Sequence, residues 1–388
     1  MPRIYLDHNA TTPVSPSVAD WMDRALRELW GNASSVHHFG QQAKAAVDEA
    51  RGHVATLLGA NPSEVVFTAG GTESDNFAIR GAAEALESAG RRHLIASAIE
   101  HEAVLKTLSA LARRGWRTTL LPVDTSGLVN PDRLREVITD DTALVSVMHA
   151  NNEIGTLQPI AELAEIAKSR GALMHTDAVQ TAGKVGIDVA ALGVDLLSIS
   201  AHKFGGPKGI GALWLKKGTR LLPFMTGGRQ ERNRRAGTEN VPAIVGFGAA
   251  ADLARQKWRA EGTRLEEMRD RLEAGILQKI SGAERNGAAT PRVPNTTNIS
   301  FERIESESLL IGLDLAGIAV SSGSACSSGT LEPSHVLKAM GLPHSRTLSS
   351  IRFSLGSGNT AAEIDQVIKV LPPLVEKLRS LTTVAGRR

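Results

Sequence analysis

The sequence predicts an α/β protein in which a large domain with a mainly parallel sheet is joined to a smaller α/β domain. Three observations lead to this prediction. The chain has 388 residues, 42% of them hydrophobic, which is enough for a large core. Short apolar runs alternate with amphipathic stretches from residue 63 onward, and a charged segment separates them from a second set of such runs. This alternation is typical of a parallel sheet that is covered by helices on both faces.

The first part of the chain supplies the large domain. The apolar runs predicted as strands are VVFTAG, HLIASAIEH, WRTTLLPV, TALVSVMHANNE, ALMHTDAVQ, DLLSISAHK and GIGALWL. The stretches predicted as helices are TESDNFAIRGAAEAL, EAVLKTLSALARRG, PDRLREVI and IAELAEIAKSRG, in which apolar residues recur every three or four positions. We expect this domain to cover residues 13–256.

The charged segment 254–280 predicts a long helix that joins the two domains. Five of its apolar residues recur at helical intervals: Trp258, Leu265, Met268, Leu272 and Ile276. It is followed by NTTNISFE, ESLLIGLDLAG, IAVSSGSAC, SHVLKAMGL, TLSSIRFSLG and a last helix from Ala361. We expect residues 1–12 and 257–388 to form the smaller domain.

Composition excludes several classes of protein. The single cysteine, Cys326, can close no intrachain disulfide and cannot supply a cysteine-rich metal site, so we expect a reducing, cytoplasmic environment. The longest uncharged stretch, residues 315–331, is shorter than the roughly 20 apolar residues of a membrane span. The 44 basic residues are interleaved with 41 acidic ones and aromatic residues make up 4%, which predicts no nucleic-acid partner.

Polar residues follow five of the predicted strands, where open α/β sheets bind their ligands. They are Gly71 and Thr72, His101, Asn152, Asp177 and Gln180, and Ser200, His202 and Lys203. Each alone can be a cap or turn residue, but capping does not require so many together. A helix N-terminus at Gly71 suits a phosphate, Lys203 could form a Schiff base, and Asp177 could hold a protonated pyridine nitrogen. Together these groups indicate pyridoxal phosphate.

Three other motif matches do not meet the structural context that they need. Ser74–Asn76 and Ser200–Lys203 fit the S-D-N and S-x-x-K motifs of β-lactamases, but in reversed order and without K-T-G. Gly246–Ala251 fits a loose dinucleotide fingerprint, yet it lies within a predicted helix of small residues. His101 and Glu102 begin an H-E-x-x-H motif that Leu105 ends. We interpret the β-lactamase match as chance and the small residues at 246–251 as a site of helix packing, and we set the metalloprotease motif aside.

Two residues of the smaller domain are candidates for substrate chemistry. Cys326 lies in the Ser/Gly-rich stretch SSGSACSSG, whereas structural cysteines usually lie in apolar runs, so it is a candidate reactive thiol. Arg352, in SSIRFSLG, is either part of a surface ion pair or a ligand for a substrate carboxylate.

The whole chain resembles one family. The motifs YLDHNATT, GNASSVHHFG, FTAGGTESDN, MHANNEIG, HTDAVQTAGK, SAHKFGGPKGIGAL, RRAGTEN, SSGSACSSGTLEPSHVL and SIRFSLG are similar, in order, to those of group I cysteine desulfurases of the nitrogen-fixation and iron–sulfur-assembly type. The resemblance implies a fold-type I pyridoxal-phosphate enzyme and a homodimer. It also implies conversion of L-cysteine to L-alanine, with the sulfur left as an enzyme persulfide.

The resemblance assigns roles residue by residue. Lys203 would hold the cofactor, His101 would stack on its ring and assist proton transfer, and Asp177 would pair with the ring nitrogen. Asn152 and Gln180 would contact the ring-oxygen side; Gly71, Thr72, Ser200 and His202 would bind the phosphate, and Thr238 would reach that of the partner subunit. Asn32 and Arg352 would hold the substrate carboxylate, and Cys326 would be the nucleophile. No resident metal is expected, although Cys326 could briefly ligate an iron–sulfur cluster on a partner.

Other functions remain open at this point. A pyridoxal-phosphate aminotransferase or a selenocysteine lyase would need Lys203 and not Cys326. A sulfur carrier or scaffold would keep the fold without using the cofactor. The sulfur acceptor is expected to be an iron–sulfur scaffold or another acceptor protein, and the pathway, nitrogen fixation or housekeeping, is left undecided.

Overall fold

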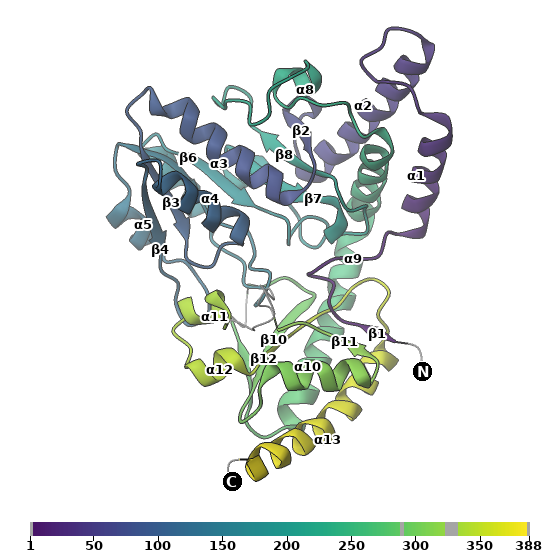
Figure 1. The fold of residues 1–388 in the computed structure, drawn as a ribbon, viewed down its shortest axis with the longest axis vertical. Coiled ribbons are helices and arrows are strands. Elements are labelled where there is room, and N and C mark those ends of the chain that lie inside the picture. Colours follow the sequence, from purple (N-terminus) through teal and green to yellow (C-terminus); the bar gives the residue numbers. More distant parts are fainter. Residues whose placement is uncertain (1–2, 288–290, 323–332, 386–388) are drawn as a thin grey trace.

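A computed structural model describes residues 3–287, 291–322 and 333–385 (Figure 1). It has an upper body around a large sheet and a lower body of smaller sheets and helices, and one long helix, α9, runs through both (Figure 1). Cys326 lies outside the described residues.

The large sheet has seven strands in the order β2-β8-β7-β6-β5-β3-β4. Their bounds are β2 Val65–Thr68, β3 His93–Ser97, β4 Arg117–Leu121, β5 Thr142–Ser146, β6 Leu173–Asp177, β7 Leu196–Ser200 and β8 Gly211–Leu215. Neighbours from β7 to β4 are parallel, whereas β8 is antiparallel to both β2 and β7. The predicted mainly parallel sheet is therefore confirmed. Because two antiparallel steps restore the direction, β2 ends at the same edge as β7.

Helices bury both faces of this sheet. They are α1 Pro16–Glu28, α2 His38–Leu58, α3 Gly71–Glu87, α4 Glu102–Ala112, α5 Pro131–Val137, α6 Ile160–Ser169, α7 Val189–Leu192, α8 Gln230–Asn233 and α9 Val241–Lys279, with short 3-10 turns at Pro62–Glu64 and Ala201–Lys203. Along the strands, successive residues alternate between two cores: Val66 and Leu94 pack with α3 and α4, and Val65 and Ile95 pack with α2 and α9.

Helix α9 connects two hydrophobic cores. Phe247, near its start, is buried in the core of the large sheet, and Leu272 and Ile276 are buried in that of the smaller body. The helix begins at residue 241, earlier than the predicted 254, because the Asn240 side chain caps it by accepting from the Ala243 backbone N–H. A Cβ at Gly248 would lie 2.5 Å from the Cα of Ala50, so the small residues here allow α2 and α9 to pack closely.

The smaller body has two sheets, with β12, β10 and β9 antiparallel and β1 and β11 parallel. Its elements are β1 Ile4–Tyr5, β9 Ala283–Asn286, β10 Thr296–Phe301, α10 Ser306–Leu315, β11 Ile318–Ala319, α11 His335–Ala339, α12 His344–Leu348, β12 Ser350–Ser354 and α13 Ala361–Ala385. Ile4 and Leu6 belong to the same core as Phe301 and Phe353. The domain boundary at residues 256 and 257 remains a prediction, and it falls between the two cores on α9.

No helix in the described ranges is long and apolar enough to cross a membrane.

A buried ion pair fastens the stretch before α9 to the edge of the large sheet. Arg51 and Glu231 form two hydrogen bonds of 2.7 Å, with side chains 6% and 3% exposed. Glu231 also accepts from the Phe67 backbone N–H at 2.9 Å, although its own backbone has a positive φ of 46°. The strained backbone at Glu231 is thus held by contacts to α2 and β2.

We expect Glu231→Gln to lower the free energy of unfolding by about 3–5 kcal/mol, because Arg51 would remain buried without a counter-charge. Chemical denaturation of the cofactor-loaded protein measures this loss. A double variant with Met at both positions should recover most of the stability, since no buried charge remains. An equal loss in the single and double variants would contradict this explanation.

Candidate active site

A cavity of about 430 Å³ lies at the carboxyl ends of the strands, between the two bodies of the molecule. It is lined by Asn9, Ala10, Gly71, Thr72, Asp75, His101, Met148, Asn152, Asp177, Val179, Gln180, Ser200, His202, Lys203, Ser321 and Arg352. The structure thus brings together every predicted cofactor-binding residue except Thr238, and adds Arg352 from β12.

Lys203 lies just beyond β7, at the end of the short turn Ala201–Lys203. Its Nζ donates to the backbone oxygens of Asn9 at 2.6 Å and Ala10 at 2.8 Å. Burial, reinforced by the positive charge of Arg352, lowers the pKa of Lys203 to about 8, although Asp177 opposes this shift. A larger share of the amine is therefore unprotonated at neutral pH than in an exposed lysine, which favours covalent attachment of a carbonyl compound.

The N-terminus of α3 forms one wall of the cavity. Gly70, just before the helix, has φ 151° and ψ −178°, a conformation that side chains rarely adopt. This turn places the backbone N–H groups of Gly71 and Thr72 at the start of a 17-residue helix, beside the cavity. Unpaired N–H groups and the helix dipole make this end suitable for a phosphate.

Side chains from the end of β7 complete this wall. Ser200 and His202 line both the cavity and an adjoining recess of about 690 Å³, which also includes Lys208. Burial lowers the pKa of His202 to about 4, and the charge of Lys203 adds to the effect, so its ring is neutral at physiological pH. The motif SAHKFGGPKG had predicted Ser200 and His202 but not Lys208, whose exposed side chain supplies positive charge at the same wall.

Asp177 is the last residue of β6 and lies near other buried polar groups. One of its oxygens accepts from the Val179 backbone N–H at 2.8 Å. Nearby, the Oδ1 of Asp75 lies 3.7 Å from the Nε2 of His175. Burial, with the negative charge of Asp177, raises the pKa of Asp75 well above its usual range, and burial lowers that of His175 to about 3. The His175 ring is therefore neutral at physiological pH.

Pyridoxal phosphate fits this donor set. Lys203 offers the amine, α3 offers N–H groups to the phosphate, and Asp177 offers a carboxylate to a protonated ring nitrogen. A positively charged ring nitrogen would also stabilise the negative charge of Asp177, which is buried beside a second carboxyl group, that of Asp75.

His101 lies at the start of α4 and lines the cavity. Its Nδ1 accepts from the Ala103 backbone N–H at 3.1 Å, which caps the helix. In the neutral ring this bond leaves the proton on Nε2. The cap thus fixes both the orientation and the tautomer of the imidazole.

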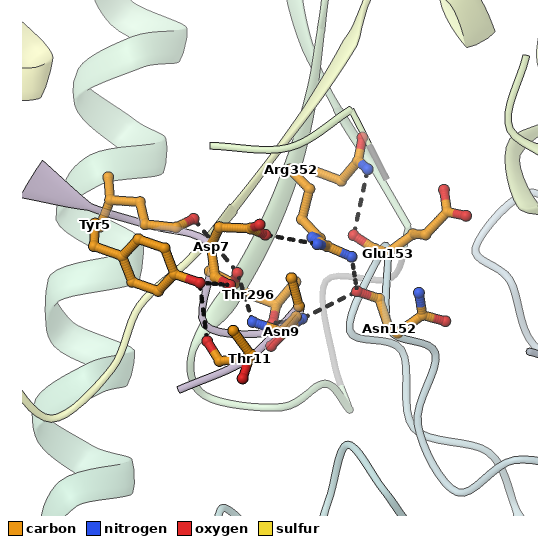
Figure 2. A network of polar contacts seen from close by, with 12 residues as sticks. Tyr5, Asp7, Asn9, Thr11, Asn152, Glu153, Thr296 and Arg352 are labelled. Carbon is orange, nitrogen blue, oxygen red and sulfur yellow. Dashed lines mark hydrogen bonds and ion pairs between the residues drawn. The ribbon is translucent and has the colours of Figure 1, made fainter. Parts of the chain in front are cut away.

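Asn9 forms several hydrogen bonds within the site, although it was not predicted as a site residue. It is 2% exposed, and its Nδ2 donates to the Asn152 backbone oxygen at 3.0 Å and to the Thr296 Oγ1 at 2.8 Å (Figure 2). Its backbone oxygen accepts from the side chains of Lys203 and Gln180. The motif YLDHNATT was recognised, but contacts remote in sequence bring it to the cavity: β1 pairs with β11, Asp7 forms a bridge with Ser354, and the Asn9 backbone N–H donates to the Ser354 Oγ.

Arg352 is 4% exposed, so the surface ion pair considered from the sequence is wrong. Its Nη1 donates to the Asn152 backbone oxygen at 3.1 Å and its Nη2 to the Oδ1 of Asp7 at 2.7 Å (Figure 2). Its Nε is buried and has no partner among the described residues. Asp7 was not predicted as a site residue.

Two predicted residues, Asn32 and Thr238, do not line this cavity, and a third, Cys326, is not described. Asn32 is exposed, and its Oδ1 accepts from the Ser34 backbone N–H at 2.9 Å. Thr238 is exposed on the stretch before α9. Cys326 lies outside the described residues. The roles of all three remain predictions.

Within the described residues, no group of three or more His, Cys, Asp or Glu side chains is placed to hold a metal ion.

Comparison with known proteins finds relatives over almost the whole chain. Residues 4–367 match the family model "Aminotransferase class-V". The chain is 51% identical to a cysteine desulfurase IscS of Methanosarcina thermophila, over 99% of this chain and 95% of that protein. It is 49% identical to a cysteine desulfurase IscS of Dictyoglomus turgidum, over 98% of this chain and 96% of that protein. A solved structure of a NifS-like protein matches with a TM-score of 0.91 at 38% identity, over 97% of this chain and all of that one.

Proposed function

The chain belongs to the class-V aminotransferase family and is a pyridoxal-phosphate-dependent cysteine desulfurase of fold type I, and we propose how its residues perform the reaction. L-cysteine is converted to L-alanine, and the sulfur is held as a persulfide on Cys326. The observation that carries this assignment is the convergence of Lys203, Asp177, the α3 N-terminus and Arg352 on one cavity.

The cofactor site follows from the contacts around the cavity. When bound, pyridoxal phosphate supplies an electron sink that weakens the bonds at the substrate Cα. Lys203 would hold the cofactor covalently, and when it is not attached its lowered pKa would let its free amine accept a proton near neutral pH. Asp177 would keep the ring nitrogen protonated. Asn152 and Gln180 would contact the ring-oxygen side, and the wall at Gly71, Thr72, Ser200 and His202 would bind the phosphate.

Two further residues orient the substrate and move protons. Arg352 binds the carboxylate of L-cysteine, since its guanidinium lines the cavity and retains a buried N–H without a protein partner. Asn32 assists at the same carboxylate. His101, with its proton on Nε2, covers the ring and assists proton transfer.

The sulfur step belongs to Cys326. Its thiolate attacks the sulfur of L-cysteine, the Cβ–S bond breaks with its electron pair leaving on carbon, and the carbon gains a proton to give L-alanine. The chain has no second cysteine, so an intrachain disulfide cannot release this sulfur. The persulfide therefore passes to an iron–sulfur scaffold or another sulfur acceptor, in the cytoplasm.

A second copy of the chain completes the site in a homodimer. Residues 222–229 are all exposed and include the large apolar side chains of Leu222, Phe224 and Met225. Phe224 lines the recess beside the phosphate wall, and Thr238 is exposed further along the chain, after the buried residues Glu231 and Ala236. Burial of this stretch against a partner would remove apolar surface from water and bring Thr238 to the partner's phosphate.

Mass spectrometry after incubation with L-cysteine tests the function. The peptide that contains Cys326 should gain one sulfur, and the solution should gain one L-alanine for each sulfur transferred. A reducing thiol should remove the added mass. Keto acid formed with an amino acceptor would instead identify an aminotransferase, and turnover of selenocysteine alone would identify a selenocysteine lyase. The absence of any borohydride-sensitive absorbance band would favour a carrier without cofactor.

A further inference from the structure

The ion pair between Asp7 and Arg352 joins the N-terminal segment to the substrate side of the cavity. The Oδ1 of Asp7 lies 2.7 Å from the Nη2 of Arg352, and the two side chains are 21% and 5% exposed. Asp7 is absent from the residues that line the cavity, whereas Arg352 is among them. The carboxylate of Asp7, which is not part of the cavity lining, therefore pairs with a guanidinium that is, and Figure 2 shows the two side chains pointing toward each other.

Asp7 is itself held firmly. Its backbone forms a bridge with Ser354, next to β12, and its backbone oxygen accepts from the Tyr5 hydroxyl at 3.0 Å. The same hydroxyl donates to the Thr11 backbone oxygen at 3.0 Å, which closes the segment into a turn (Figure 2). A carboxylate fixed in this way can set the position of its partner.

Of the three guanidinium nitrogens of Arg352, two have hydrogen-bond partners among the described residues and one does not. Nη2 is paired with Asp7 and Nη1 with the Asn152 backbone oxygen. The Nε–H is buried and finds no acceptor in the part of the chain that the structure describes. A buried N–H without an acceptor lowers the stability of the protein, so this N–H is suited to donate to an anionic oxygen of a ligand.

We infer that Asp7 is a positioning residue for the substrate: by fixing one edge of Arg352, it directs the remaining N–H groups toward the carboxylate of L-cysteine. This inference rests on the proposed function. The charge of Arg352 lowers the pKa of Lys203 and the charge of Asp7 raises it. Loss of Asp7 should therefore lower the pKa of Lys203 further, as well as releasing Arg352.

The test is a double-mutant cycle with Asp7→Ala and Arg352→Ala in the holoenzyme. Asp7→Ala should raise the KM for L-cysteine and the Kd for L-alanine, measured by calorimetry, about tenfold, with a much smaller change in kcat. Because Asp7 acts through Arg352, the double variant should be no worse than Arg352→Ala alone. Asp7→Asn, which keeps an oxygen acceptor, should fall between the wild type and Asp7→Ala.

Asp314→Ala is the matched control, because it removes an exposed carboxylate that pairs at 3.4 Å with Arg3, the residue just before β1. It should leave KM and Kd unchanged. Thermal unfolding of each variant separates a folding defect from a binding defect. Additive effects in the cycle, a lower KM in Asp7→Ala, or an unchanged KM would each overturn the inference. If the wild type releases no sulfur from L-cysteine, the failure lies with the proposed function instead.

Discussion

Cys326→Ala should lose sulfur release from L-cysteine by about 10³-fold or more, while the protein keeps its bound cofactor and its absorbance band. The chain has no other thiol to take over the attack on the substrate sulfur. The cofactor site is built from Lys203, Asp177 and α3, which lie elsewhere in the chain, so its occupancy should not change. Sulfide and L-alanine assays with the purified variant measure the loss.

Ser327→Ala, next to Cys326, serves as the matched control and should retain near wild-type turnover. Full activity of Cys326→Ala would refute the persulfide mechanism and leave the aminotransferase and selenocysteine lyase alternatives. Loss of the absorbance band in the same variant would also contradict the proposal, because it would mean that Cys326 supports the cofactor site.

Lys203→Ala should abolish the absorbance band that responds to borohydride and lower desulfurase activity by at least about 10³-fold. The variant loses both the covalent attachment and the amine whose pKa is lowered to about 8. The Ala10 backbone oxygen also loses the Lys203 donor, and the Asn9 backbone oxygen keeps only the donor from Gln180. Spectra of the purified variant with added pyridoxal phosphate measure the first effect, and the alanine assay measures the second.

Lys216→Ala is a suitable control, because Lys216 is 48% exposed and pairs with Asp195 at 3.5 Å, outside the residues that line the cavity. This variant should bind the cofactor and turn over normally. A borohydride-stable linkage in Lys203→Ala would show that another lysine holds the cofactor. Lys184, whose Nζ donates to the cavity residue Gln180 at 2.9 Å, is one such lysine.

Much of the large domain could be predicted because its strands and helices have clear and different periodicities. The groups at Gly71, His101, Asp177 and Lys203 followed from one rule, since parallel strands end at a shared edge. The sequence did not predict that β8 lies between β2 and β7 in the opposite direction, because an apolar run such as GALWL does not encode its direction. The α3 N-terminus still lies beside the cavity, because β2 ends at the same edge of the sheet as β7.

The missed residues depend on contacts that are remote in sequence. Asp75 follows Thr72 by three positions on α3, so helical spacing could have placed both on the cavity side. Asn9 and Asp7 reach the site only through pairing between the first strand and the smaller body, which no local pattern reveals. Asn32 and Thr238 have exposed side chains, and their predicted partners are the substrate and the phosphate of the partner subunit, which lie outside a single chain.

The link between the first residues and the last third of the chain also bears on biosynthesis. Asp7 contacts Arg352 and Asn9 contacts Thr296, so contacts that span most of the sequence hold the Lys203 region in place. A ribosome makes the N-terminal segment first, but its partners emerge last. The cofactor residues, up to Lys203, are therefore made before Thr296 and Arg352, so the contacts on the substrate side of the site can form only after most of the chain has emerged. A product that ends before Arg352 would carry the cofactor residues but lack the guanidinium proposed to bind the substrate carboxylate.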